Sequence, residues 1–391
     1  MPSPALDRSV LKSAKAALRN YPAVVILGSR QVGKTTLAKH LAETRKKGWV
    51  YLDLESPRDL ARLRDAESYL ESQSGKLVVI DEVQRMPELF PMLRAIIDRD
   101  RKPGRFLLLG SSSPSVVQRT SESLAGRVAY LELMPFSVQE VGIDQASKLW
   151  LRGGYPEVFL TRNNAVAFDR LEQFIRTFIE RDLPQLGLGA DARTTMQLLR
   201  MVATVHGQML NASMLAKSMG LSVHTVQRYL SFFEHAFLVF MLPSYHTNLR
   251  KRLVKTPKIN ILDTGILHAL NGIHSTDQLK GHHLQGHSWE SFVIQQVRAR
   301  YGKAAGLHYF RTQDGSELDL IITRGTKLAA AVEIKTTNAP ALSKGNQLAF
   351  EAARAPLQLI CTPTAEDFPY SKSIRVCSLG TLFKHLDKVV G

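Results

Sequence analysis

The sequence contains only two cysteines, Cys361 and Cys377, among 391 residues. Neither lies near a group of histidines and cysteines at metal-site spacing, so we expect two reduced, buried thiols. No apolar run approaches the roughly 20 residues that cross a bilayer. The first residues also lack the basic and then apolar layout of a signal peptide. These absences exclude a disulfide-rich secreted domain and predict a cytoplasmic protein with no membrane partner.

Acidic residues are scarce relative to basic ones, 35 against 51, which gives a net charge of +16. The excess is unevenly spread: residues 1–50 carry ten lysines and arginines against two acids, and residues 201–260 carry seven against one acid, Glu234. Such a local excess favours a polyanionic partner, most simply DNA. A solvated basic face is the alternative that charge alone leaves open.

A complete phosphate-binding loop of the pattern G-x-x-x-x-G-K-[ST] occupies residues 28–35. An apolar run at 23–27 precedes it and a helical pattern at 36–42 follows, which is the strand, loop and helix order that phosphate binding requires. Gly28 and Gly33 allow the backbone to curl so that its N–H groups face the phosphates. The N-terminus of the following helix adds a partial positive charge.

Two side chains of this loop carry the expected chemistry. Lys34 is predicted to reach the β- and γ-phosphates, and the Thr35 hydroxyl to ligate Mg²⁺. ATP and Mg²⁺ are therefore the expected cofactors. The predicted nucleotide-binding residues are Gly28, Ser29, Arg30, Gln31, Val32, Gly33, Lys34, Thr35 and Thr36.

About 45 residues after the loop, the run 76–82 ends in the pair Asp81 and Glu82. Four apolar residues before two carboxylates describe a buried parallel strand whose carboxyl end meets a ligand. We expect Asp81 to hold Mg²⁺ and Glu82 to polarise the attacking water. Alternation along a strand would turn one side chain to the metal and the next to the nucleophile.

Two further catalytic candidates lie later in this part of the chain. Ser112 follows the apolar run 105–110 and is predicted to sense the γ-phosphate or orient water, with helix capping as an equal alternative. Arg127 is the candidate arginine finger. Its rivals are Arg119 and Arg85, and a purely structural arginine is the alternative.

The predicted strands alternate with helices, which indicates a doubly wound parallel sheet, an α/β P-loop NTPase fold. Several strings resemble a widespread group of prokaryotic AAA-type ATP-binding proteins, in which the ATPase precedes a module of unknown function. The resemblance implies an ATPase of the AAA superfamily and a homo-oligomer, with a hexamer as the usual form for the class. It extends over residues 20–365 and is carried by residues 28–36, 80–89, 109–113, 123–128, 150–157, 180–183, 251–258 and 262–265.

The middle of the chain contains a candidate DNA reader. Residues 210–230 fit a helix-turn-helix, with Gly220 in the turn and Ser222 as the N-cap of the second helix. An apolar run at 237–242 and the basic run that follows resemble a wing. A winged helix used for packing or dimerisation is the alternative. The predicted DNA contacts are His224, Thr225, Gln227, Arg228, Arg250, Lys251 and Arg252.

Near the C-terminus, a helix carrying Glu290 precedes three predicted strands joined by hairpins. If the last hairpin is centred on position 326, Asp319 and Glu333 face each other on one side of the sheet, and Lys335 shares that side. Clustered carboxylates are costly unless a cation neutralises them, which predicts Mg²⁺ at Glu290, Asp319 and Glu333.

This set of three carboxylates and a lysine resembles the restriction-endonuclease-like PD-(D/E)xK superfamily, in which Lys335 would assist a nuclease reaction. An inactivated nuclease fold, or a solvated ladder of charges, is the alternative.

These patterns predict four domains: an AAA-type ATPase at 1–145, a helical lid or linker at 146–192, a winged-helix domain at 193–280 and a small α/β nuclease-like domain at 281–391. The expected function is a Mg²⁺-dependent ATPase that acts on DNA. An ATP-controlled oligomeric switch or scaffold, which binds DNA or a protein without cutting, is the rival. A protein-remodelling motor is a third possibility.

Overall fold

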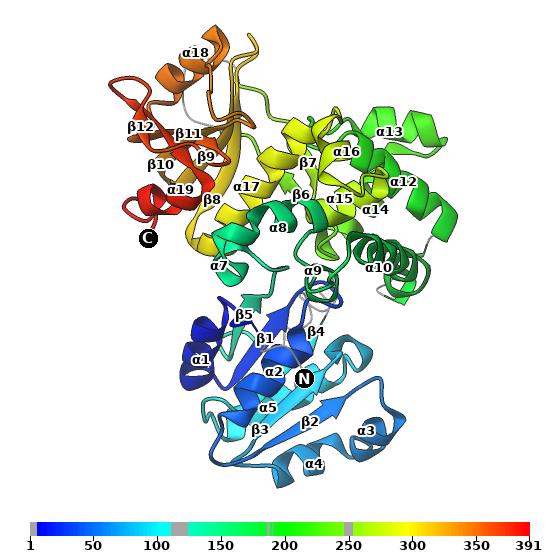
Figure 1. Ribbon diagram of the computed structural model, residues 1–391. Helices are drawn as coiled ribbons and strands as arrows, with labels where there is room; N and C mark the ends of the chain where they lie inside the picture. Colours follow the sequence, from blue (N-terminus) through cyan, green and yellow to red (C-terminus); the bar gives the residue numbers. More distant parts are fainter. Residues whose placement is uncertain (1–5, 111–123, 186–187, 190, 246–252) are drawn as a thin grey trace.

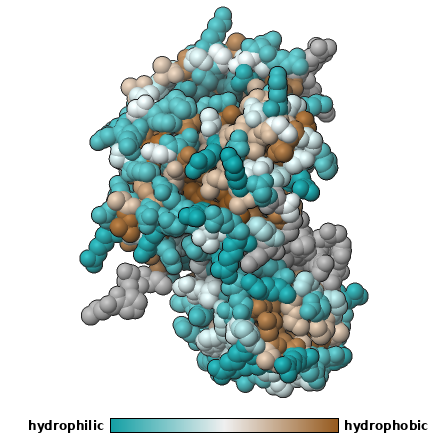
Figure 2. Space-filling model, turned by 90° about the vertical axis from the view of Figure 1, so that its right-hand side faces the viewer, coloured by the Kyte–Doolittle hydropathy of each residue, from teal (hydrophilic) through white to brown (hydrophobic). Residues whose placement is uncertain are grey.

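The computed structural model describes residues 6–110, 124–185, 188–189, 191–245 and 253–391. Three parts follow one another along the chain (Figure 1). An α/β body holds the N-terminal third, a helical part lies beside and above it, and a second α/β part holds the C-terminus. Among the described residues, no helix is long and apolar enough to cross a membrane. The space-filling view shows a mainly hydrophilic surface with smaller apolar areas (Figure 2).

The N-terminal body is built on a five-stranded sheet of order β2-β3-β4-β1-β5, in which every pairing is parallel. Its core strands are apolar throughout, as expected for strands that are covered on both faces. This confirms the predicted P-loop NTPase fold. The strands are β1 (Ala23–Leu27), β2 (Trp49–Asp53), β3 (Leu77–Asp81), β4 (Phe106–Gly110) and β5 (Val128–Glu132).

Helices cover both faces of this sheet. Side chains that alternate along β1 pack to opposite sides: Val24 and Ile26 join α1 and α2, whereas Val25 joins α4 and α5. Two short helices, rather than one, lie between β2 and β3. The helices are α1 (Leu11–Asn20), α2 (Lys34–Glu43), α3 (Pro57–Arg62), α4 (Ala66–Ser72) and α5 (Leu89–Arg99), with the short η1 (Val83–Arg85).

The helical part packs around one hydrophobic core that includes residues from both the predicted lid and the predicted winged-helix domain, for example Leu171 and Leu198. Its helices are α7 (Val138–Val141), η2 (Ile143–Gln145), α8 (Ala146–Arg152), α9 (Pro156–Phe159), α10 (Asn164–Thr177), the π-helical turn η3 (Phe178–Asp182), α11 (Leu183–Gln185), α12 (Ala192–Thr204), α13 (Ala212–Met219), α14 (Val223–His235), α15 (Thr264–Leu270) and α16 (Thr276–Lys280). A two-stranded antiparallel sheet joins β6 (Val239–Leu242) to β7 (Lys258–Ile261).

The C-terminal part is a mixed sheet of order β12-β13-β11-β10-β9-β8. Residues of α17 and α19 pack on one face and residues of α18 on the other. The strands are β8 (Gly306–Arg311), β9 (Glu317–Arg324), β10 (Lys327–Ile334), β11 (Leu357–Thr362), β12 (Phe368–Pro369) and β13 (Ile374–Ser378); the helices are α17 (Gln285–Tyr301), η4 (Gly302–Ala304), α18 (Lys344–Ala353) and α19 (Leu379–Leu386).

Candidate functional site

The phosphate-binding loop leaves β1 at the carboxyl edge of the parallel sheet and enters α2. Gln31 and Gly33 have positive φ angles of 59° and 95°, so the loop turns through the left-handed region twice. Gly28 has a second constraint. A Cβ at this position would lie 2.4 Å from the carbonyl oxygen of Leu133, so only glycine allows the chain after β5 to pass this close.

Lys34 is buried and its ammonium group points back at the loop. Its Nζ donates to the carbonyl oxygens of Gly28 at 2.9 Å and Ser29 at 2.8 Å. Burial lowers the pKa of Lys34, and the carboxylates of Glu82 and Asp81 oppose that effect. The two carboxylates thus offset part of the cost of burying the Lys34 charge at the phosphate loop.

Asp81 joins the end of β3 to the start of α2. The Thr35 hydroxyl donates to Asp81 Oδ2 at 2.6 Å, and the Tyr51 hydroxyl donates to the same oxygen at 2.7 Å. A hydroxyl and a carboxylate side by side are oxygen ligands of the kind Mg²⁺ prefers, so these residues fit the expected ion. The sequence analysis missed Tyr51. In the sequence, the only feature that could indicate a role for Tyr51 is its hydroxyl group on β2, the strand that pairs with β3.

Glu82 does not continue the strand. Its φ of 53° and ψ of 42° are left-handed, so the expectation that strand alternation separates Asp81 from Glu82 is wrong. The left-handed turn of the backbone at Glu82 instead directs the Asp81 and Glu82 side chains to different places. Burial raises the pKa of Glu82, while Lys34 and a hydrogen bond from the Gln84 amide lower it. A left-handed non-glycine residue is a strained feature that is common at active sites.

Arg30 lies in the phosphate loop but its guanidinium forms an ion pair with Asp182 in η3. Glu55 lies beside the pair, 4.0 Å from Arg30 and 3.7 Å from Arg181. The same carboxylate is 2.7 Å from Arg85, one of the rival finger residues. The loop is thus tied to the helical part by a cluster of charges that has no sequence motif.

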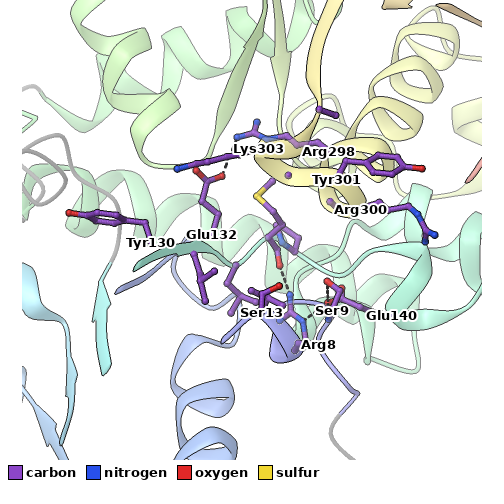
Figure 3. Close-up of a pocket in the computed structure, with 18 residues that line it drawn as sticks. Arg8, Ser9, Ser13, Tyr130, Glu132, Glu140, Arg298, Arg300, Tyr301 and Lys303 are labelled. Carbon is purple, nitrogen blue, oxygen red and sulfur yellow. Dashed lines mark hydrogen bonds and ion pairs between the residues drawn. The ribbon is translucent and has the colours of Figure 1, made fainter. Parts of the chain in front are cut away.

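Arg8 contacts the phosphate loop and also lines the pocket drawn in Figure 3. Its guanidinium donates to the carbonyl oxygen of Val32 at 2.8 Å, to that of Met134, and to Glu140 at 3.0 Å. This pocket is a cavity of about 560 Å³ between the end of β5 and the end of α17. An ion pair of 3.7 Å between Glu132 and Arg298 connects these two elements. Sequence reasoning missed Arg8, because a lone arginine before a helix carries no pattern.

Of the remaining catalytic candidates, only Arg127 can be placed relative to this centre. Ser112 and Arg119 lie outside the described residues. Arg127 precedes β5, at the edge of the sheet opposite the phosphate loop, and forms two 2.7 Å bonds with Asp98. This pairing matches the structural alternative, and a finger role toward a neighbouring subunit stays a prediction.

The predicted helix-turn-helix is present as α13 and α14. Gly220 ends α13 with a φ of 65°, and the Ser222 hydroxyl caps α14 by accepting from the Thr225 N–H at 3.0 Å. The Thr225 hydroxyl also bonds to Ser222, so it serves the cap. The other residues predicted on α14 are exposed: His224, Gln227 and Arg228. Arg250, Lys251 and Arg252, between β6 and β7, lie outside the described residues, and DNA contact stays a prediction.

In the C-terminal sheet, the pairs beside the turn, such as Lys327 with Arg324, are offset by one residue from the predicted register. The predicted register holds from the pair Ala330 and Ile322 to the pair Val332 and Leu320, and its continuation brings Glu333 opposite Asp319. A shift in the ladder between Leu328 and Ala330 produces this register. Asp319 Oδ2 accepts from the Ile334 N–H at 2.8 Å. Burial, Glu290 and Glu333 raise the pKa of Asp319.

Glu333 is nearly buried and has two side-chain donors. Its Oε1 accepts from Lys335 Nζ at 2.7 Å and from the Asn346 amide at 2.8 Å. Burial raises the pKa of Glu333 to about 7, against the opposing effect of Lys335. The predicted contact between Lys335 and the carboxylate face is thus present.

Lys258 is the residue of this cluster that sequence reasoning missed. It comes from β7, is 6% exposed, and its Nζ lies 2.5 Å from Glu317 Oε1. Burial acts to lower the pKa of Lys258, but Glu290, Asp319 and Glu317 outweigh burial and raise it. Lys258 and Lys335 are cations already in place beside these carboxylates, so the electrostatic cost alone does not require a metal.

In the described part of the chain, no three or more His, Cys, Asp or Glu side chains form a group that could hold a metal ion. The residues Glu290, Asp319 and Glu333 as placed do not make a ready three-ligand site. The second Mg²⁺ site stays a prediction.

Three family models match successive segments of the chain. Residues 20–142 match an AAA domain, residues 143–277 a domain of unknown function (DUF8612), and residues 285–382 another domain of unknown function (DUF4143). The first match identifies the phosphate-loop body as an AAA domain. The other two descriptions assign no activity.

Related whole chains were found in mycobacteria. The uncharacterized proteins Rv2008c of Mycobacterium tuberculosis and Mb2031c of Mycobacterium bovis are each 39% identical over 367 residues, which cover 94% of this chain and 82% of theirs. Among solved structures, the Walker-type ATPase PABY2304 of Pyrococcus abyssi covers 68% of this chain and 96% of its own, with 17% identity and a TM-score of 0.48.

Proposed function

This chain belongs to the same family as the uncharacterized protein Rv2008c of Mycobacterium tuberculosis, and with its AAA domain at residues 20–142 as the starting point we propose that it is a Mg²⁺-dependent ATPase that acts on DNA. One observation supports ATP hydrolysis in addition to nucleotide binding. The Thr35 hydroxyl and Asp81 lie 2.6 Å apart at the phosphate loop, and Glu82 follows directly, turned away by its left-handed backbone. Two metal ligands with a further carboxylate beside them are the groups that the attack of water on the γ-phosphate requires.

Each residue of the centre has a distinct task in this proposal. The N–H groups of residues 28–35 and the Lys34 ammonium bind the phosphates. Thr35 and Asp81 would hold Mg²⁺, which neutralises charge on the phosphates when bound. Tyr51 fixes the rotamer of Asp81 by its 2.7 Å bond. Glu82 orients the water and accepts its proton, a role that its raised pKa suits.

DNA is proposed as the object of hydrolysis on the basis of charge and placement. Residues 201–260 carry seven lysines and arginines against one acid, and α14 exposes His224, Gln227 and Arg228. An exposed helix after a tight turn is the arrangement that enters a major groove. The proposal of a homo-oligomer follows from the resemblance to AAA proteins alone.

A second candidate is an ATP-controlled switch that binds DNA or a protein without cutting. It is favoured by the pairing of the C-terminal carboxylates Glu317 and Glu333 with Lys258 and Lys335. Incubation of branched, forked and linear DNA with Mg²⁺ or Mn²⁺ tests whether the C-terminal part cuts DNA, which the switch does not. Cleavage by the wild type that Glu333→Ala abolishes supports a nuclease, and an equal lack of cleavage in both proteins supports the switch.

The experiment that tests the proposed function is the ATPase rate with and without a panel of DNA structures. We expect turnover that needs Mg²⁺ and rises with at least one DNA form. The affinity for that DNA should fall steeply with salt, because phosphate contacts release counterions. ATP turnover that no DNA changes, together with DNA affinity that salt does not change, would contradict the DNA part.

A further inference from the structure

The ion pair between Arg30 and Asp182 joins the phosphate loop to the π-helical turn η3, 152 positions later in the chain. We propose that the guanidinium of Arg30 is shared between Asp182 and the phosphates of a bound nucleotide, so that nucleotide binding releases η3. This inference rests on the proposed nucleotide-binding function. In this proposal, Asp182 competes with the nucleotide for Arg30 and so opposes nucleotide binding. The same competition couples nucleotide binding to the helical part.

Arg30 is placed to reach both partners. It lies inside the loop whose N–H groups face the phosphates, two positions after Gly28. Its side chain keeps 29% of its surface exposed, so it has room to turn. Burial lowers the pKa of Lys34, and the positive charge of Arg30 adds to that effect. The two cations are therefore close enough at the phosphate loop to affect each other electrostatically.

Asp182 depends on Arg30. Its side chain is 7% exposed, and Arg30 is its only ion-pair partner among the described residues. Burial raises the pKa of Asp182, while Arg30 and Arg181 lower it. A buried carboxylate that loses its partner is strongly destabilised. When phosphate draws Arg30 away, we therefore expect Asp182 to leave its present position.

The turn that carries Asp182 is suited to move. π-Helical turns are rare, are less regular than α-helix, and occur frequently at functional sites. Phe178 and Ile179 of η3 pack in the same core as Leu198 of α12 and Val226 of α14. A shift of η3 thus reaches the helix-turn-helix through packed side chains. Glu55 offers Arg30 a second carboxylate at 4.0 Å, which eases its change of partner.

Two readouts test the coupling in the full chain. Amide hydrogen exchange of residues 174–185 is measured with and without ADP and Mg²⁺, and affinity is measured with N-methylanthraniloyl-ADP. We expect ADP to speed exchange of this segment in the wild type by about tenfold, an ordinary size for coupling between two sites. Because coupling is reciprocal, Asp182→Asn should bind the probe more tightly by a similar factor.

The two partners should respond with opposite sign. Arg30→Ala removes a phosphate ligand and should weaken probe binding, whereas Asp182→Asn strengthens it. In both variants, the amides of residues 174–185 should exchange quickly without ADP, and adding ADP should not speed their exchange further. Arg176→Ala is the matched control, because this neighbouring arginine is 68% exposed and, in the part of the chain that the structure describes, pairs with Glu180 alone. It should leave both readouts unchanged.

The inference is overturned if Asp182→Asn weakens probe binding as Arg30→Ala does, which is what a merely structural pair predicts. It is also overturned if the wild type binds the probe but exchange in residues 174–185 does not change. This second result requires no variant, so it does not depend on folding of a mutant. A wild type that binds no nucleotide would overturn the proposed function as well.

Discussion

Lys258 Nζ lies 2.5 Å from Glu317 Oε1, although the lysine belongs to β7 of the helical part and the glutamate to β9 of the C-terminal sheet. The lysine is 6% exposed, and the charges of Glu290 and Asp319 also act on it. One side chain thus compensates several carboxylates and ties two parts of the molecule together.

The first prediction concerns this lysine. Lys258→Met should lower the free energy of unfolding by about 3–5 kcal/mol, because it leaves a buried carboxylate cluster without its cation. Denaturant unfolding measures the loss, and adding Glu317→Leu to the variant should restore part of it. Lys280→Met is the control, since Lys280 is 66% exposed and should change stability little. Equal stability of Lys258→Met and wild type would contradict the assigned role.

A second prediction gives a pH dependence. Asp263 is buried, caps α15 and accepts from the Gly154 N–H at 2.7 Å, and burial raises its pKa to about 6. The folded state therefore holds this proton more tightly than the unfolded state. The contribution of Asp263 to stability is greatest below its unfolded pKa of 3.8 and is lost as pH rises through about 6.

Between pH 5 and 7.5, this loss should amount to about 1 kcal/mol in the wild type and be absent in Asp263→Asn. The stability difference between the two proteins should shrink accordingly as pH rises. Asp191→Asn is the comparison, because Asp191 also caps a helix but the hydrogen bond from Thr194 lowers its pKa. Its difference from wild type should be constant over this window. A constant difference for Asp263→Asn would contradict the prediction.

A third prediction tests the role of Tyr51. Tyr51→Phe removes the hydroxyl that donates to Asp81 and leaves the ring in place. We expect the Mg²⁺ concentration for half-maximal ATPase activity to rise by about tenfold, as for other residues that orient a metal ligand. Tyr21→Phe is the control, since Tyr21 is 41% exposed. An unchanged Mg²⁺ requirement in Tyr51→Phe would count against this role.

Arg8 gives a fourth prediction. Arg8→Ala leaves the carbonyl oxygens of Val32 and Met134 without a side-chain donor, at a cost of about 2 kcal/mol. Nucleotide affinity should fall because the loop loses this support. Arg8→Lys should restore only part of the affinity, because an ammonium group cannot reproduce the planar array of donors. Full affinity in Arg8→Ala, measured by fluorescent-nucleotide titration, would refute the idea.

The parts of the site that could be predicted from sequence are local. The loop at 28–35 and the strand that ends at Asp81 carry their chemistry within a few residues of a turn or strand end. The hairpin register was predictable because side chains alternate along strands. The rest depends on contacts between distant segments: Arg30 and Asp182 are 152 positions apart, and Arg8 and Met134 are 126 positions apart. No pattern in either segment specifies its partner.

Strand alternation also misled the sequence analysis at Glu82. A left-handed residue that is not glycine cannot be read from composition, since the surrounding structure imposes it. Lys258 shows the same limit at the other end of the chain. It belongs to a basic run that charge alone assigns to DNA, yet it is buried against carboxylates of another module.

The most direct test of the account is ATP turnover by the wild type, Lys34→Ala and Glu82→Gln, with nucleotide binding measured beside it. We predict Mg²⁺-dependent turnover by the wild type, and none by Lys34→Ala. Glu82→Gln should bind ATP as the wild type does and turn it over at least about a hundredfold more slowly, because it lacks the base for the attacking water. Unchanged turnover in Lys34→Ala or in Glu82→Gln would contradict the central claim that this centre hydrolyses ATP.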